Sequence, residues 1–140
     1  MKVKIFRTDK DFQMKAENEQ GHSMQMDAVK DIGGNESGFR PMQLLLIALG
    51  GCASIDVLQI LKKQRQKIDA FEVEIEGHRT QIEDYSLFKD ITLHFKVAGN
   101  LSYEKLEKAI LLSLGKYCSV AKTLAPTASI NYKITIHAKS

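Results

Sequence analysis

The chain of 140 residues carries a net charge of +3, and 26% of its residues are charged, which fits a single domain over residues 1–140. Its basic residues are dispersed without interleaved aromatic side chains, so no nucleic-acid partner is expected. Residues 1–9 lack the apolar stretch of a secretory signal. With two cysteines and no such signal, we expect a cytoplasmic protein whose thiols are inert, metal-binding or redox-active.

Alternation of apolar with polar residues predicts strands near residues 3–5, 12–17, 24–27, 71–76, 91–97 and 130–136. The first three would form an antiparallel meander with a methionine-rich inner face, and residues 33–38 an irregular loop. Residues 77–89 are polar and short enough for a hairpin connection.

Pro41–Lys63 is the most apolar stretch and predicts a helix, because proline suits the first helical position. From Met42 to Leu61 the clearly polar residues are Gln43, Ser54, Asp56 and Gln59. A helix that is apolar on nearly every face belongs in an interior. The carboxylate within the run argues against a membrane span, so no membrane partner is expected.

A second helix is predicted from Ser102, a good cap, to Tyr117, with Glu104 favourable in its first turn. The resulting order is βββ-α-ββ-α-β, which indicates an α+β fold. One sheet and the second helix cannot cover all faces of Pro41–Lys63. We therefore expect a homodimer with these helices at its core.

The two cysteines are the candidate reactive residues. Cys52 follows Gly50 and Gly51, and glycines inside a helix indicate that another backbone or a substrate approaches closely. Asp56 lies one turn beyond Cys52, and Cys118 follows the second helix. Neighbouring helices could bring the two thiols to disulfide distance. The residues alone leave two interpretations open: two small buried hydrophobes, or a redox pair.

The segments P-M-Q-L-L-L-I-A-L-G-G-C-A-S-I-D-V and K-Y-C-S-V-A resemble the two cysteine motifs of the OsmC/Ohr family of thiol-dependent peroxidases. The resemblance covers essentially the whole chain and is greatest to a divergent OsmC-like branch. It implies an OsmC-like fold and an intertwined homodimer, with central helices between two antiparallel sheets. It also implies a role in the oxidative stress response.

By this resemblance, Cys52 is the peroxidatic cysteine and Cys118 the resolving cysteine. Cys52 would reduce an organic hydroperoxide and become a sulfenic acid, which Cys118 would convert to a disulfide. An external dithiol would then reduce the pair. No cofactor is expected, and no metal site, because the histidines and cysteines show no ligand spacing.

Two departures from the family concern the activation of Cys52. The family has a glutamate directly after the proline, where this chain has Met42, and an arginine in the first hairpin that residues 8–11 do not match. Arg40 and Lys10 are the cations that we consider as thiolate support, although lysine lacks the planar fork of arginine. Without a nearby cation, we expect the Cys52 thiol to stay mostly protonated at pH 7.

These departures leave open whether the protein is an enzyme. We expect an apolar substrate pocket with Met42, Leu45 and Leu49 among its walls. The alternatives are a non-enzymatic protein that binds a small apolar ligand and carries vestigial cysteines, or a redox sensor in which the disulfide changes the packing of the dimer.

Overall fold

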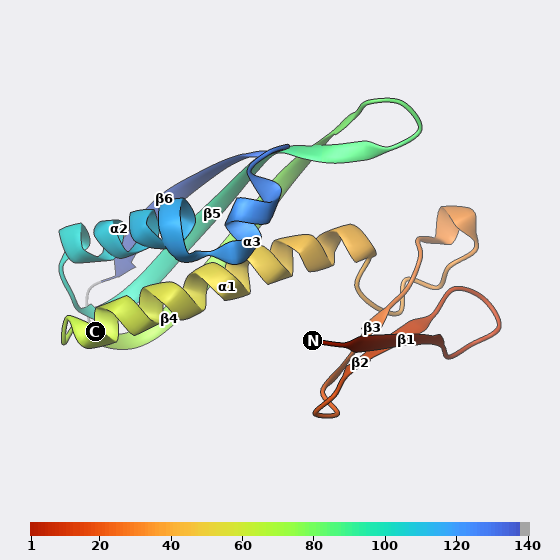
Figure 1. Ribbon diagram of the computed structural model, residues 1–140, viewed down its shortest axis with the longest axis horizontal. Helices are drawn as coiled ribbons and strands as arrows, with labels where there is room; N and C mark the ends of the chain where they lie inside the picture. The colour runs from red at the N-terminus through yellow and green to blue at the C-terminus, as the bar shows by residue number, and fades with distance from the viewer. Residues whose placement is uncertain (138–140) are drawn as a thin grey trace. The chain divides into compact units, whose positions relative to one another are not determined.

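The structure is a computed structural model, and it describes residues 1–137. The predicted order of strands and helices and the α+β class are confirmed, with short helical segments added (Figure 1). The chain divides into two compact units, Met1–Leu45 and Leu46–Ser140.

The first unit is built on an antiparallel sheet of strands β1 (Val3–Arg7), β2 (Met14–Asn18) and β3 (Ser23–Met26), in the order β1-β2-β3. Met14 pairs with Met26, which is buried, whereas Met24 is exposed. The predicted methionine-rich inner face is therefore confirmed only in part. A short 3₁₀ helix, η1 (Lys30–Ile32), follows β3 and was not predicted.

The loop after η1 is held by one buried carboxylate. Asp27 accepts hydrogen bonds from the backbone N–H groups of Ala28 (2.7 Å), Asn35 (3.1 Å) and Ser37 (3.1 Å), and from the Ser37 hydroxyl (2.6 Å). Irregular backbone needs partners for its polar groups, and Asp27 supplies them here. The loop is irregular, as expected, but is fixed by its hydrogen bonds.

Helix α1 (Pro41–Lys63) has the bounds that its sequence predicts. Its start carries a cap that the sequence reading missed. The Gln43 side chain accepts a hydrogen bond from the Arg40 N–H at 3.0 Å, while the Gln43 N–H donates to the Arg40 carbonyl. This is one half of a capping box, in which the third helical residue reaches back to the residue before the helix.

The second unit contains a sheet of strands β4 (Lys67–Gln81), β5 (Ser86–Asn100) and β6 (Ser129–His137), in the order β4-β5-β6. The hairpin loop is only residues 82–85, closed by the Ile82 N–H donating to the Tyr85 carbonyl, so the predicted connection was too long. Strand β6 runs parallel to β5. This sheet is therefore mixed, whereas the family resemblance implied antiparallel sheets.

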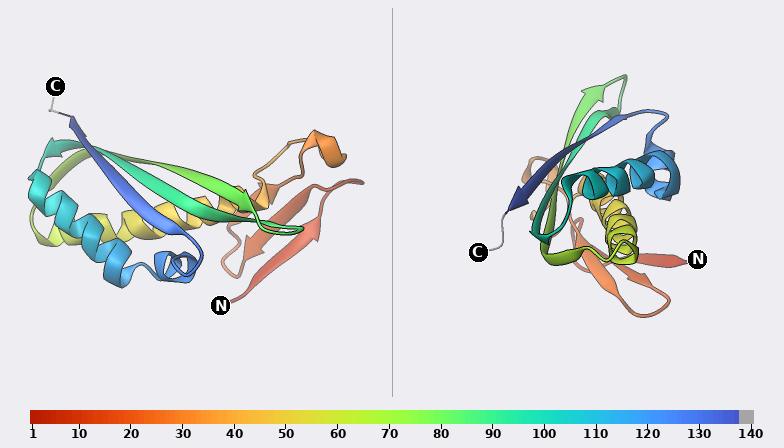
Figure 2. Two further views of the ribbon diagram at one scale, coloured as in Figure 1. Left: turned by 90° about the horizontal axis from the view of Figure 1, so that it is seen from above. Right: turned by 90° about the vertical axis from the view of Figure 1, so that its left-hand side faces the viewer.

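The core of the second unit lies between one face of this sheet and its helices (Figures 1 and 2). Alternate β5 residues and one stripe of α1 are fully buried: Ile91, Leu93, Phe95, Val97, Leu49, Ala53, Val57 and Leu61. The outer sheet face is polar, and Lys96 there pairs with Glu74 at 2.6 Å and Glu72 at 3.4 Å. Alternation along β4 and β5 thus separates a buried face from a hydrated one.

The second predicted helix is divided in the structure. Helix α2 (Tyr103–Leu112) begins at Ser102, whose hydroxyl accepts the Lys105 N–H at 3.4 Å, which confirms the predicted cap. A π-helical turn, η2 (Ser113–Tyr117), continues it up to Cys118, and a further helix, α3 (Ser119–Leu124), was not predicted. Turns of the π type are rare and often occur at functional sites.

Candidate functional site

Cys52 lies in the middle of α1 and is half-buried. It has the buried Ala53 and Leu49 nearby on the same helix, which fix the helix against the sheet. Asp56 lies four residues further on, so it projects from the same side of the helix one turn away. The Asp56 side chain is also half-buried.

Cys118 lies at the junction of η2 and α3 and is fully buried. Its backbone N–H donates to the Ser113 carbonyl at 2.8 Å, which closes the π turn. Its sulfur accepts the Ala121 N–H at 3.4 Å, so the thiol caps α3. Burial raises the pKa of the Cys118 thiol to about 11, with the nearby Cys52 adding to the rise. Cys118 is therefore a neutral thiol at pH 7.

The structure brings Cys52, Asp56 and Cys118 together. The two sulfur atoms and one Asp56 carboxylate oxygen all lie within 4.8 Å of one another. The fully buried Ser113 donates its hydroxyl to Asp56 Oδ2 at 2.8 Å. The π turn thus supplies the donor that orients the carboxylate, and the residue that follows the turn supplies the thiol.

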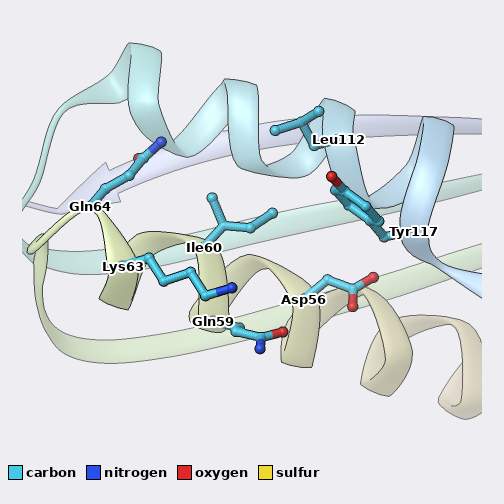
Figure 3. A pocket seen from close by; sticks show the side chains of 7 residues that line it. All are labelled: Asp56, Gln59, Ile60, Lys63, Gln64, Leu112 and Tyr117. Carbon is cyan, nitrogen blue, oxygen red and sulfur yellow. The ribbon is translucent and has the colours of Figure 1, made fainter.

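A groove adjoins Asp56 between α1 and the α2–η2 segment (Figure 3). Its volume is about 590 Å³. The lining residues combine apolar and polar side chains: Asp56, Gln59, Ile60, Lys63, Gln64, Leu112 and Tyr117. Asp56 and Lys63, seven residues apart along α1, supply a carboxylate and an ammonium group to the lining of the groove, and the Lys63 side chain extends toward Gln59 (Figure 3).

The other residues predicted from sequence have different surroundings. Leu49 is fully buried in the core of the second unit, while Leu45 is 39% exposed and Met42 half-buried. Arg40 and Lys10 are exposed and belong to the first unit, whereas both cysteines belong to the second. Their predicted roles as pocket walls and as thiolate support stay predictions.

Ser113 and Tyr117 are site residues that sequence reasoning missed, because the second helix was predicted to run through both without a role for either side chain. The three-atom cluster was also missed. Its members come from two elements far apart in the chain, so local ligand spacing could not reveal it.

Comparison with known proteins supports the resemblance found in the sequence. A family model described as "OsmC-like protein" matches residues 33–133. Protein YhfA of Escherichia coli is 37% identical over 121 residues, which cover 86% of this chain and 87% of YhfA.

Two solved structures are similar over nearly their whole length. A hypothetical protein from Aquifex aeolicus has a TM-score of 0.84 at 25% identity, over 99% of this chain and 97% of the other. An organic hydroperoxide resistance protein OsmC from Legionella pneumophila has a TM-score of 0.72 at 13% identity, over 96% and 97%, and so shows the fold alone. With the family model covering most of its length, the chain belongs to the OsmC-like family.

Proposed function

We propose that the protein is a thiol-dependent peroxidase that reduces organic hydroperoxides with Cys52 and Cys118. The observation that carries this proposal is the approach of the two sulfur atoms to within 4.8 Å from separate elements. Membership of the OsmC-like family supports a function related to redox chemistry or peroxides. The Legionella protein of the same fold is named an organic hydroperoxide resistance protein.

The different burial of the two thiols supports the proposed order of their reactions. Cys52 is half-buried and within reach of a substrate, whereas Cys118 is fully buried. In the first step the Cys52 thiolate attacks the distal peroxide oxygen, the O–O bond breaks, and the alcohol leaves. Cys52 is oxidised to a sulfenic acid, and the hydroperoxide ROOH is reduced to ROH.

Asp56, with a carboxylate oxygen within 4.8 Å of the Cys52 sulfur, is the proton acceptor for the Cys52 thiol in this proposal. A carboxylate close to a sulfur atom does not stabilise a standing thiolate, since like charges repel. It can instead take the thiol proton as the sulfur attacks and return it to the departing alkoxide. The hydrogen bond from Ser113 holds the carboxylate in place for this transfer. Asp56 would thus do the work that the family assigns to an arginine–glutamate pair.

Cys118 completes the oxidation. Its thiol condenses with the Cys52 sulfenic acid, forming an S–S bond and releasing water. The sulfur atoms must move from within 4.8 Å to a bonded distance of about 2.0 Å. An external dithiol then reduces the disulfide by exchange and is itself oxidised to a disulfide. The cytoplasm, where thiols are kept reduced, is the compartment that suits this cycle.

We also propose that the working form is a homodimer built on α1. Four large apolar residues of this helix are exposed in the single chain: Leu45 (39%), Ile47 (40%), Ile55 (69%) and Leu58 (38%). By length and composition α1 would also suit a membrane span. The buried stripe that packs on the sheet and the Asp56–Ser113 hydrogen bond favour a core helix covered by a second copy.

The test is consumption of cumene hydroperoxide in the presence of a dithiol reductant. We expect the wild-type protein to turn over, and Cys52→Ser to show only the background rate. Cys118→Ser should form one equivalent of sulfenic acid, trapped with dimedone, without turning over. A wild-type rate no higher than that of Cys52→Ser would refute the proposal.

The groove beside Asp56 supports a second candidate function, the binding of a small ligand without turnover. Ile60, Leu112 and the ring of Tyr117 offer apolar surface there, and Lys63 offers a cation for an acidic group. Native mass spectrometry of the purified protein should then show a bound small molecule that Leu112→Asp releases. Peroxidase turnover in the same preparation would favour the first function.

A further inference from the structure

The cluster of Cys52, Asp56 and Cys118 has the donor atoms of a metal site. Two sulfur atoms and a carboxylate oxygen lie within 4.8 Å of one another. In a tetrahedral zinc site with Zn–S bonds of about 2.3 Å, the ligand atoms lie about 3.7 Å apart. The cluster therefore needs to contract by about 1 Å at most, which side-chain rotation can supply.

The hydrogen bonds around the cluster resemble those that orient the ligands of metal sites. Ligating carboxylates are usually oriented by a second hydrogen bond, and Asp56 receives one from Ser113 at 2.8 Å. Ser113 is fully buried, and its carbonyl also accepts the N–H of Cys118, so the same turn fixes two of the three ligands. On the α1 side of the cluster, Cys52 and Asp56 lie one helical turn apart.

The charge of the cluster also favours a metal ion. Metal binding displaces the thiol protons, and two thiolates and a carboxylate then offer three negative charges to the ion in a partly enclosed place. A divalent ion offsets the repulsion among these three charges. Zinc accepts both thiolate and carboxylate ligands, and three protein ligands leave its fourth position open to water or a small anion.

We propose that the reduced protein binds one zinc ion per chain through the sulfur atoms of Cys52 and Cys118 and a carboxylate oxygen of Asp56. Binding removes the thiol protons, so it releases protons to solvent and strengthens as the pH rises. The disulfide form lacks both thiolates and cannot hold the ion. Zinc binding and peroxide reduction therefore use the same sulfur atoms and exclude one another.

The test is a zinc titration of chelator-treated, reduced protein in competition with a chromophoric chelator. We expect one zinc ion per chain. Asp56→Asn should weaken binding at least tenfold, Ser113→Ala should weaken it about 10- to 100-fold as for other residues that orient a ligand, and Cys118→Ala should abolish it. Asp90→Asn, which removes an exposed carboxylate on β5, is the matched control and should bind as the wild type does.

Two further measurements keep the result independent of peroxidase activity and of folding. Cobalt(II) added to the reduced protein should give a sulfur-to-metal charge-transfer band that is absent after disulfide formation with diamide. Circular dichroism should show Asp56→Asn folded. Zinc bound equally by the wild type and Asp56→Asn, or by the oxidised protein, would overturn the proposal, whether or not hydroperoxide is consumed.

Discussion

At the scale of single residues, Cys118 shows how burial sets the state of a thiol. Its sulfur is fully enclosed, and burial raises its pKa to about 11 from an ordinary value of 9.0. The N–H groups of Ala121 and Val120 act in the opposite direction but do not offset burial. The resolving thiol in the proposed cycle therefore keeps its proton until it reacts.

This raised pKa predicts a loss of stability at alkaline pH. Between pH 9 and 11 the unfolded chain releases the Cys118 proton while the folded chain keeps it. The unfolded state then binds fewer protons, so the free energy of unfolding falls as pH rises, by about 3 kcal/mol in all. Urea unfolding from pH 8 to 11, with reductant and chelator present, should show this fall. In Cys118→Ala this part of the fall in the free energy of unfolding with pH should be absent. An equal fall in both proteins would contradict the raised pKa of Cys118.

Asp27 is a second residue whose surroundings favour its charged form. The hydrogen bond from the Ser37 hydroxyl lowers the pKa of Asp27 most, and those from the backbone of Ser37, Ala28 and Asn35 lower it further. The unfolded chain binds the Asp27 proton at higher pH than the folded chain does. The stability contributed by Asp27 is thus present above pH 4 and is lost as the pH falls through the lowered value.

Hydrogen exchange should report the pH-dependent contribution of Asp27 at the loop itself. We expect the protection factors of the Asn35 and Ser37 amides to fall on acidification in the wild-type protein. In Asp27→Asn they should be low throughout and nearly independent of pH. Asp31→Asn, an exposed acid in η1, should behave as the wild type does. Protection that does not change with pH in the wild type would contradict the role given to Asp27.

At the scale of elements, the sequence predicted most strands well because one face of each sheet is buried and the other is hydrated. It failed at residues 77–89, where the β4 residues 78–81 are polar and exposed on both faces, so the apolar–polar alternation of β4 disappears. It also missed η2, because α-helical spacing from Leu106 and Ile110 places Tyr117 inward, whereas the π turn leaves Tyr117 53% exposed and buries Cys118. The cysteine pair followed from its motifs, but the contact of Ser113 with Asp56 depends on tertiary packing.

Gly77 is a glycine that packing of β4 requires. A Cβ at this position would lie 2.6 and 2.7 Å from the ring of Phe88 and 3.0 Å from Leu46. The ring is buried and cannot turn away cheaply, so Gly77→Ala should cost about 1–3 kcal/mol of stability. Urea unfolding measures this. Gly115→Ala, where a Cβ meets nothing within 4 Å, is the matched control and should be neutral or slightly stabilising.

A double variant tests whether the ring is the cause. Phe88→Leu removes the contacting ring atoms, so Gly77→Ala should cost less in that background than in the wild type. A coupling of at least 0.5 kcal/mol, of the order found between touching residues, is expected. A cost that is unchanged by Phe88→Leu would place the strain elsewhere, for example in the strand backbone.

At the scale of the whole molecule, the two faces of α1 have different surroundings. One stripe packs on the sheet of its own chain, and the opposite side presents Ile47, Ile55 and Leu58 to the outside. Leu45, 39% exposed, lies two turns before Cys52 on the side of that thiol. Gly51 lies on the open side, where a Cβ would meet nothing within 4 Å. An apolar helical face without cover is unfavourable in water, and a second copy of the helix is the proposed cover.

Ile55 is the most exposed of these residues, at 69%, and Ile55→Asp should separate the proposed dimer. Each copy would lose about 2 kcal/mol of apolar burial, so two copies raise the dissociation constant about 10³-fold. Analytical ultracentrifugation across a range of protein concentrations measures this. Ile82→Asp, at an exposed isoleucine in the hairpin loop, is the control and should leave the oligomeric state unchanged.

Gly51→Ala distinguishes a covered face from an open one. In a monomer the added methyl meets nothing, and the gain in helix propensity over glycine stabilises the chain by about 0.5–1 kcal/mol. In a dimer packed on this face, the methyl pushes the two helices apart and weakens association. We therefore expect Gly51→Ala to dissociate more readily than the wild type, yet to unfold at higher urea in the Ile55→Asp background. Stabilisation in both backgrounds would mean that α1 has no partner on this side.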